Sequence, residues 1–203
     1  MNIRGTTRAV VATVVMATAF AAPPATAAVD SHVDPARDVV FNSDDGNKNA
    51  PGNKSADITK FTVAHTAKKI VVTMRLRDLV DNEPFALLQF KAAGSSKRFI
   101  ASWMRDQYQD EPVEEYLYLT HGTGTVECSS LRARASFEKN RLTISMNRSC
   151  LGSPKSVRVG GMMGMNGPDG SGYLDFSHRK GGATMEALDA GSGIPLGPAV
   201  KRG

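Results

Sequence analysis

Two runs of alternating residues, joined by a short turn and flanked by the only two cysteines, constrain the fold of this chain most strongly. Apolar residues alternate with arginine and other polar residues over 131–138, and Leu, Ile and Met alternate with polar residues over 141–147. A period of two buries one face of a strand and leaves the other in water. With Lys139-Asn140 as the turn, the pattern predicts an antiparallel hairpin with one apolar face.

The first 28 residues read as a secretory signal peptide. They start with two arginines and no acidic residue, continue with an apolar run over 9–22, and end in small residues suited to signal peptidase. The run is shorter than the roughly 20 residues that span a bilayer. We therefore expect cleavage after Ala27 or Ala28 and a secreted, extracellular protein.

Both cysteines, Cys128 and Cys150, lie in the exported part, just outside the two ends of the predicted hairpin. An oxidising compartment favours their pairing, and neither has the C-x-x-C spacing or nearby histidine of a metal site or reactive thiol. A bridge would close a loop of about 23 residues and stabilise the fold by roughly 3 kcal/mol. We predict a disulfide.

The mature chain of roughly 175 residues is long enough for one domain with a real core. We expect an irregular N-terminal arm over 29–56, a β-sandwich domain over 57–176 and a loosely held Gly/Pro-rich tail over 177–203. Alternation and turn signals place further strands near 57–65, 70–76, 85–93, 98–105, 113–120 and 155–165. Eight or nine short strands without an amphipathic helix predict an all-β, antiparallel, jelly-roll-like sandwich, with a small closed barrel as the alternative.

The charge pattern argues against a nucleic-acid partner. The formal net charge is +5, and the leader supplies two of these charges. Apart from Lys68-Lys69 and Lys201-Arg202, the basic residues stand singly or alternate with neutral ones, so clusters of Lys and Arg are missing. The C-terminus has no apolar tail, and we expect no membrane anchor.

No catalytic signature emerges from the sequence. The nucleophile pattern G-x-S-x-G is missing, and the four histidines follow no zinc-binding spacing. His65 falls on the apolar face of a predicted strand, which favours a hydrogen-bonded core histidine. We assign no catalytic residue and expect a protein that is not an enzyme.

The N-terminal arm is rich in carboxylates, which are the hard oxygen ligands that Ca²⁺ requires. These acids are Asp34, Asp38, Asp44, Asp45 and Asp57. The stretch 42–47 fails the calcium-loop pattern, because Gly46 comes one place early and no Glu closes the loop. Asp, Asn and Gly also gather wherever turns form, so turn chemistry stays open beside a calcium site.

Aromatic side chains close together in the sequence offer a candidate ligand-binding face, because exposed rings stack on sugars. They are Trp103, Tyr108, Tyr116 and Tyr118. Trp103 shares a strand face with Phe99 and Ala101, which favours a core position instead. Aromatic residues make up only 6% of the chain, which is few for a carbohydrate platform.

Motifs over 34–79 resemble small secreted bacterial β-sandwich proteins similar to DOMON and family 9 carbohydrate-binding-module domains. These motifs are Asp34-Pro35-x-x-Asp38-Val39, Ala56-Asp57-Ile58, Val63-x-His65-Thr66 and Ile70-Val71-Val72-Thr73-Met74-Arg75. The resemblance implies a jelly-roll-like sandwich, in some members a bound sugar or haem, and structural calcium near the N-terminal strand. It adds weight to Asp34, Asp38 and Asp57 as ligands. The chain lacks the paired exposed tryptophans of a sugar site, and no clear Met and His pair marks a haem site.

Taken together, these patterns predict a secreted, non-enzymatic β-sandwich binding module for an extracellular glycan or protein, with Ca²⁺ as a stabilising ion. The alternative is a structural or protein-interaction domain without a small-molecule site. A secreted hydrolase ranks last, because it would need a histidine and carboxylates to converge in a cleft.

Overall fold

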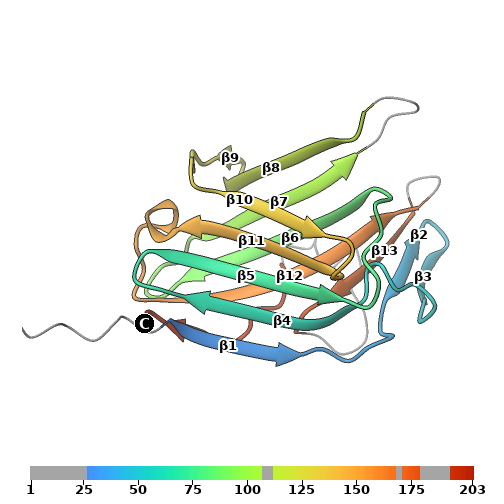
Figure 1. Ribbon diagram of the computed structural model, residues 1–203, viewed down its shortest axis with the longest axis horizontal. Coiled ribbons are helices and arrows are strands. Elements are labelled where there is room, and N and C mark those ends of the chain that lie inside the picture. The colour runs from blue at the N-terminus through green and yellow to red at the C-terminus, as the bar shows by residue number, and fades with distance from the viewer. Residues whose placement is uncertain (1–26, 107–111, 168–170, 179–192) are drawn as a thin grey trace, which may run out of the picture.

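The computed structural model describes residues 27–106, 112–167, 171–178 and 193–203, and it confirms the predicted antiparallel β-sandwich (Figure 1). Sheet A has the order β1-β4-β5-β11-β10. Its strands are β1 (Ala28–Val33), β4 (Ile58–His65), β5 (Lys69–Leu76), β11 (Arg141–Asn147) and β10 (Arg132–Ser136). Every pairing within it is antiparallel.

Sheet B has the order β3-β2-β13-β12-β6-β7-β8-β9, with β14 paired to one end of β12. Its strands are β2 (Val40–Ser43), β3 (Gly46–Asn49), β6 (Pro84–Ala92), β7 (Arg98–Asp106), β8 (Glu114–His121), β9 (Gly124–Thr125), β12 (Ser156–Asn166), β13 (Gly172–Phe176) and β14 (Ala199–Lys201). A single 3₁₀ turn, η1 (Arg148–Leu151), follows β11. The described part of the chain contains no candidate membrane-spanning helix.

The core fills the space between the two sheets, as the period-two alternation predicts. Its largest fully buried side chains include Trp103, Phe61 and Phe90. Phe61 of sheet A packs directly on Gly161 of sheet B, where a Cβ atom would come within 2.4 Å of the Phe61 ring. The missing side chain at this position therefore allows the sheets to approach closely.

The predicted hairpin and disulfide are both confirmed. Strands β10 and β11 pair from Arg132↔Ser145 to Ser136↔Arg141. Cys128 and Cys150 form a disulfide with a Cα–Cα distance of 5.5 Å. The bridge closes the open end of the hairpin, and its second cysteine, Cys150, lies within η1.

The segment expected to be an irregular arm is more ordered than its composition indicates. It contributes three strands, of which β1 forms an edge of sheet A against β4, and β2 and β3 form an edge of sheet B. Strand β2 includes Val40 and Phe41 of the only apolar run in this segment, Val39-Val40-Phe41, which by itself indicates a possible short strand. The edge strand β3 has one neighbour and no apolar side chain, so alternation cannot reveal it.

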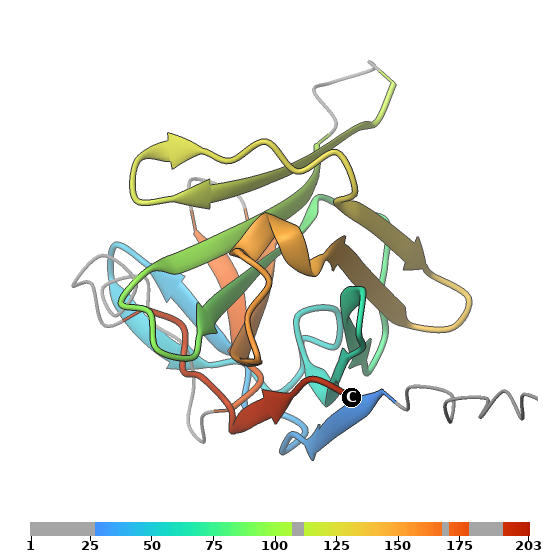
Figure 2. The ribbon, with the colours of Figure 1, turned by 90° about the vertical axis from the view of Figure 1, so that its left-hand side faces the viewer.

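The described part of the C-terminal tail is also held in place. Ile194 and Val200 are buried, and the backbone N–H of Gly203 donates to the carbonyl of His65 at 3.0 Å. Figure 2 shows β14 lying beside β1. The remainder of the tail, 179–192, lies outside the described residues.

Candidate metal centre

Three aspartates gather at one end of the sandwich. Asp34 follows β1, Asp38 precedes β2, and Asp175 lies on β13. One carboxylate oxygen from each lies within 4.8 Å of the others. Segments far apart in the sequence, from both sheets, thus bring three acidic groups together.

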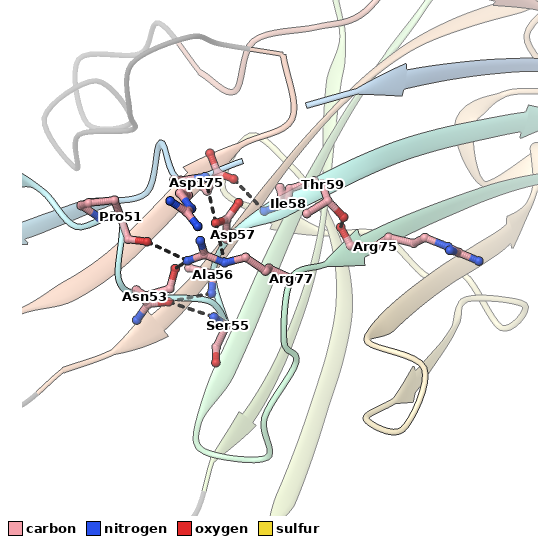
Figure 3. Close-up of polar contacts among 11 residues, drawn as sticks. Pro51, Asn53, Ser55, Ala56, Asp57, Ile58, Thr59, Arg75, Arg77 and Asp175 are labelled. Carbon is pink, nitrogen blue, oxygen red and sulfur yellow. Dashed lines mark hydrogen bonds and ion pairs between the residues drawn. The ribbon is translucent and has the colours of Figure 1, made fainter. Parts of the chain in front are cut away.

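The loop that enters β4 holds a fourth aspartate, Asp57, beside this cluster (Figure 3). Asn53 shapes the loop, because its Oδ1 accepts the backbone N–H groups of Ser55 and Ala56, each at 3.0 Å. Arg77 anchors the same loop by donating from Nη2 to the carbonyls of Pro51 and Asn53 at 2.8 and 2.6 Å. The side chains of Asn53 and Arg77 thus hold the backbone of this loop in place, and with it Asp57.

Asp57 differs from the other three acids because an arginine side chain, Arg77, forms an ion pair with it. Its Oδ2 lies 3.1 Å from Nε of Arg77 and accepts the backbone N–H of Arg37 at 3.0 Å. Burial raises the pKa of Asp57, against the lowering effects of Arg37 and Arg77. This carboxylate serves mainly to tie Arg37 and Arg77 to the entrance of β4.

Asp34 and Asp175 are buried carboxylates with unused oxygens. Asp34 is 3% exposed and Asp175 is fully buried. Both carboxylate oxygens of Asp34 and Oδ1 of Asp175 have no hydrogen-bond partner among the described residues. Oδ1 of Asp34 lies 3.5 Å from Nε2 of His32 without a hydrogen bond between them, whereas Oδ2 of Asp175 accepts the backbone N–H of Ile58 at 2.7 Å. A buried charge without such partners is costly.

The cost of burying these negative charges also raises the pKa values of the three aspartates. Burial, together with the neighbouring charges of Asp38 and Asp57, raises the pKa of Asp34 to about 8. Burial raises the pKa of Asp175 to about 9, against the lowering effect of the Ile58 N–H. Burial also raises the pKa of Asp38. With these pKa values Asp34 and Asp175 hold their protons near neutral pH when no cation is bound, and a bound cation would compete with those protons.

The donor set fits a hard divalent cation. All three groups offer carboxylate oxygen, which suits Ca²⁺ or Mg²⁺ rather than the softer metals that prefer nitrogen or sulfur. Ca²⁺ takes six to eight oxygen ligands in flexible geometry, and backbone carbonyls or water commonly complete its shell. Mg²⁺ demands a tighter octahedral arrangement, so three acids on three separate segments suit Ca²⁺ better.

The sequence-predicted ligands lie as follows. Asp34 and Asp38 are in the cluster, and Asp57 lies beside it, engaged with Arg77. Asp44 and Asp45 are exposed at the turn between β2 and β3, as turn chemistry predicts. Sequence reasoning missed Asp175. One feature of the sequence could have revealed it: Asp175 lies two residues after Tyr173, on the inward strand face, where an apolar residue is expected.

The structure does not bring the candidate aromatic residues together as one exposed face. Trp103 is fully buried, and its Nε1–H donates to Oε1 of Glu115 at 2.7 Å. Tyr116 and Tyr118 are exposed on one face of β8, and Tyr108 lies outside the described residues. Trp103 therefore belongs to the core, as its place beside Ala101 favoured.

Among the described histidines, His65 is buried and His178 is half-buried. Nδ1 of His65 lies 3.1 Å from the carbonyl oxygen of Val200, and burial lowers its pKa. His178 packs against His32, with ring centroids 4.6 Å apart, and makes a T-shaped contact with the Phe61 ring. His65 is thus the hydrogen-bonded core histidine that its strand position predicts.

A cavity of about 350 Å³ is lined by residues of the β2–β3 hairpin and of β6, β12 and β13. Amide and hydroxyl side chains make up half of the lining residues, and Phe85 and Leu174 supply apolar walls. This cavity and the acidic cluster share strands β2 and β13 as neighbours.

The fold and the cluster define an antiparallel β-sandwich with an acidic, oxygen-only centre between its sheets. Comparison of the chain with known proteins found no matching family model, no matching curated protein and no matching solved structure.

Proposed function

We propose that this protein is a secreted, non-enzymatic β-sandwich binding module whose fold is stabilised by one Ca²⁺ held by Asp34, Asp38 and Asp175. The supporting observation is the meeting of three carboxylates within 4.8 Å, two of them buried with an oxygen that lacks a hydrogen-bond partner among the described residues. A calcium ion would supply the missing charge and ligand contacts.

Placement outside the cell is consistent with this proposal. The leader pattern predicts export, and the disulfide is typical of oxidising compartments. Calcium sites of extracellular modules bind in the range of about 0.1 to 1 mM. A site built from three acids on separate segments suits such an affinity, because bringing the segments together costs part of the binding energy.

The test is a thermal melt of the mature protein in excess Ca²⁺, in excess Mg²⁺ and in chelator. A ligand at 100 times its Kd stabilises the folded state by about 2.7 kcal/mol. For a chain of this size that corresponds to a rise in Tm of about 5 to 10 °C. We expect this rise with Ca²⁺ and a smaller one with Mg²⁺.

A pair of matched variants tests whether the rise in Tm with Ca²⁺ depends on the aspartate cluster. Asp34→Asn keeps the size of the side chain and removes its charge, and Asp45→Asn makes the same change at the exposed turn. The Ca²⁺ shift should disappear in the first and persist in the second. Equal melts with and without Ca²⁺ in the unmodified protein would refute the calcium site and favour an interaction domain without a small-molecule site.

A further inference from the structure

The outer face of sheet A gathers basic residues that are scattered in the sequence. Core residues such as Val63, Val72 and Ile144 point inward, so the alternate positions of each strand face solvent. The basic residues on this outer face are Lys60, Lys69, Arg75, Arg132, Arg134 and Arg141. No Asp or Glu occupies an outward position on the five strands of this sheet.

Three of these cations form a row across neighbouring strands. Lys60 of β4 pairs with Arg75 of β5, and Arg75 pairs on its other side with Arg141 of β11. Adjacent strands lie about 4.8 Å apart, so the row spans only about 10 Å at the backbone. Like charges directly opposite each other destabilise a sheet, and this row therefore works against the stability of the fold.

Acidic residues do not neutralise the row. None of Lys60, Arg75 and Arg141 forms an ion pair with a residue in the described part of the chain. Figure 3 shows the side chain of Arg75 extending away from the aspartate cluster. Lys60 and Arg75 are exposed and Arg141 is half-buried, which leaves their charges available to a partner.

A row of hydroxyl groups runs beside the cations. Ser31, Thr62, Thr73 and Thr143 occupy successive strands in register. Oγ of Ser31 lies 3.3 Å from Oγ1 of Thr62, and Oγ1 of Thr73 lies 3.5 Å from Oγ1 of Thr143. Hydroxyls both donate and accept hydrogen bonds. The face therefore offers positive charge beside a line of groups that can bind neutral hydroxyls.

The side chains on this face favour one class of anionic partner over nucleic acids and membranes. It carries no aromatic side chain on which bases of a single-stranded nucleic acid would stack. Its large exposed apolar side chains, Val29 and Val33, lie on the edge strand β1 rather than across the face, as membrane insertion would need. A polymer that carries both acidic groups and many hydroxyls matches the paired rows of cations and hydroxyls.

We infer that the outer face of sheet A binds a linear anionic polysaccharide bearing carboxylate or sulfate groups. Arg75, Arg141 and Lys60 would pair with the acidic groups, and the threonine row would contact the sugar hydroxyls. This inference rests on the proposed function, since it names the ligand class of the binding module. It uses residues separate from the calcium ligands, so its failure would leave the calcium melt unchanged.

The test measures binding of the mature protein to heparin oligosaccharide in solution, at low and physiological salt, with neutral dextran as the negative probe. The test variant is Arg75→Thr with Arg141→Thr, which keeps β-forming residues in both strands. The control is Lys97→Thr with Lys155→Thr, which removes the same charge from exposed positions outside sheet A. Thermal melts verify that both variants fold.

We expect heparin binding that weakens with salt, falls by about tenfold or more in the sheet A variant, and stays within about twofold in the control. Equal losses in the two variants would reduce the effect to net charge and overturn the inference. So would the lack of heparin binding by the unmodified protein. Tighter binding to duplex DNA or to vesicles containing phosphatidylserine, with the same dependence on Arg75 and Arg141, would also overturn the polysaccharide as the partner.

Discussion

Asp175 of sheet B accepts the backbone N–H of Ile58 of sheet A through Oδ2 at 2.7 Å, across 117 residues of sequence. The bond ties β13 to the start of β4 at the end of the sandwich where the acids gather. The same carboxylate has its second oxygen unpartnered among the described residues. Asp175 thus links the packing of the two sheets to the candidate metal centre.

This double role predicts different effects of two substitutions at Asp175. Asp175→Asn keeps an oxygen acceptor for Ile58 N–H, whereas Asp175→Ala leaves that buried N–H without a partner. An unsatisfied buried donor costs about 1 to 3 kcal/mol. In chelator, the Ala variant should be less stable than the Asn variant by that amount in urea unfolding. Equal stability of the two variants would show that the bond to Ile58 contributes little.

The raised pKa values of the acids predict a pH dependence for the calcium-free protein. The pKa is about 8 for Asp34 and about 9 for Asp175, against 3.8 ordinarily. Each folded carboxyl holds its proton more tightly than the unfolded one, so its stabilising contribution is complete below 3.8 and is lost as the pH rises through 8 to 9. In chelator, stability should therefore fall as the pH is raised toward 9.

The pH range of this test has to avoid the range in which histidines change the stability. Burial and the neighbouring His32 lower the pKa of His178 from 6.5 to about 4, so its contribution is present above 6.5 and is lost as the pH falls toward 4. Melts from about pH 6.5 to 9 therefore report mainly on the aspartates. The variant Asp34→Asn with Asp175→Asn should flatten the curve, and an unchanged slope would contradict this assignment.

The disulfide predicts a sizeable loss on reduction. Cys128 and Cys150 are 22 residues apart, and a loop of this size gives a stabilisation of roughly 3 kcal/mol. Replacing both cysteines by serine should lower the free energy of unfolding by about that amount. Mass spectrometry after alkylation of the unreduced, unfolded protein should find no free thiol, and two alkylated cysteines would disprove the bridge.

The close contact of the sheets at Gly161 predicts an effect of a single methyl group. A Cβ atom there would meet the Phe61 ring at 2.4 Å, whereas one at Gly52 would meet no atom within 4 Å. Gly161→Ala should destabilise the protein by about 1 to 3 kcal/mol through overpacking, while Gly52→Ala should change little. A neutral Gly161→Ala in urea unfolding would show that Phe61 shifts without cost.

Local patterns in the sequence were enough to predict much of the fold. Alternation placed β4, β5, β10 and β11 with their inward faces, because a half-buried strand leaves a direct trace of period two. The position of the cysteines at the ends of the hairpin gave the disulfide. The pairing of β13 between β2 and β12 left no such trace, since strand order depends on contacts between distant segments.

The candidate metal centre and the basic face of sheet A also depend on contacts between distant segments, so the sequence predicted them only in part. Asp34 and Asp38 stood out as acids in a polar arm, but their partner Asp175 lies far along the chain and joins them only in the folded protein. The cations of sheet A appeared isolated because they are two residues apart on a strand or lie on different strands. Register places Arg75 opposite Arg141, and register was not predicted for that pair.

The most direct test of the central claim is a calorimetric titration of the mature, metal-free protein with Ca²⁺ near neutral pH. We expect one Ca²⁺ to bind per chain with a Kd of about 0.1 to 1 mM, and we expect this binding to be lost in Asp34→Asn and retained in Asp45→Asn. Binding that is undetectable in the unmodified protein, or that survives in Asp34→Asn, would contradict the assignment of Asp34, Asp38 and Asp175 as a calcium site.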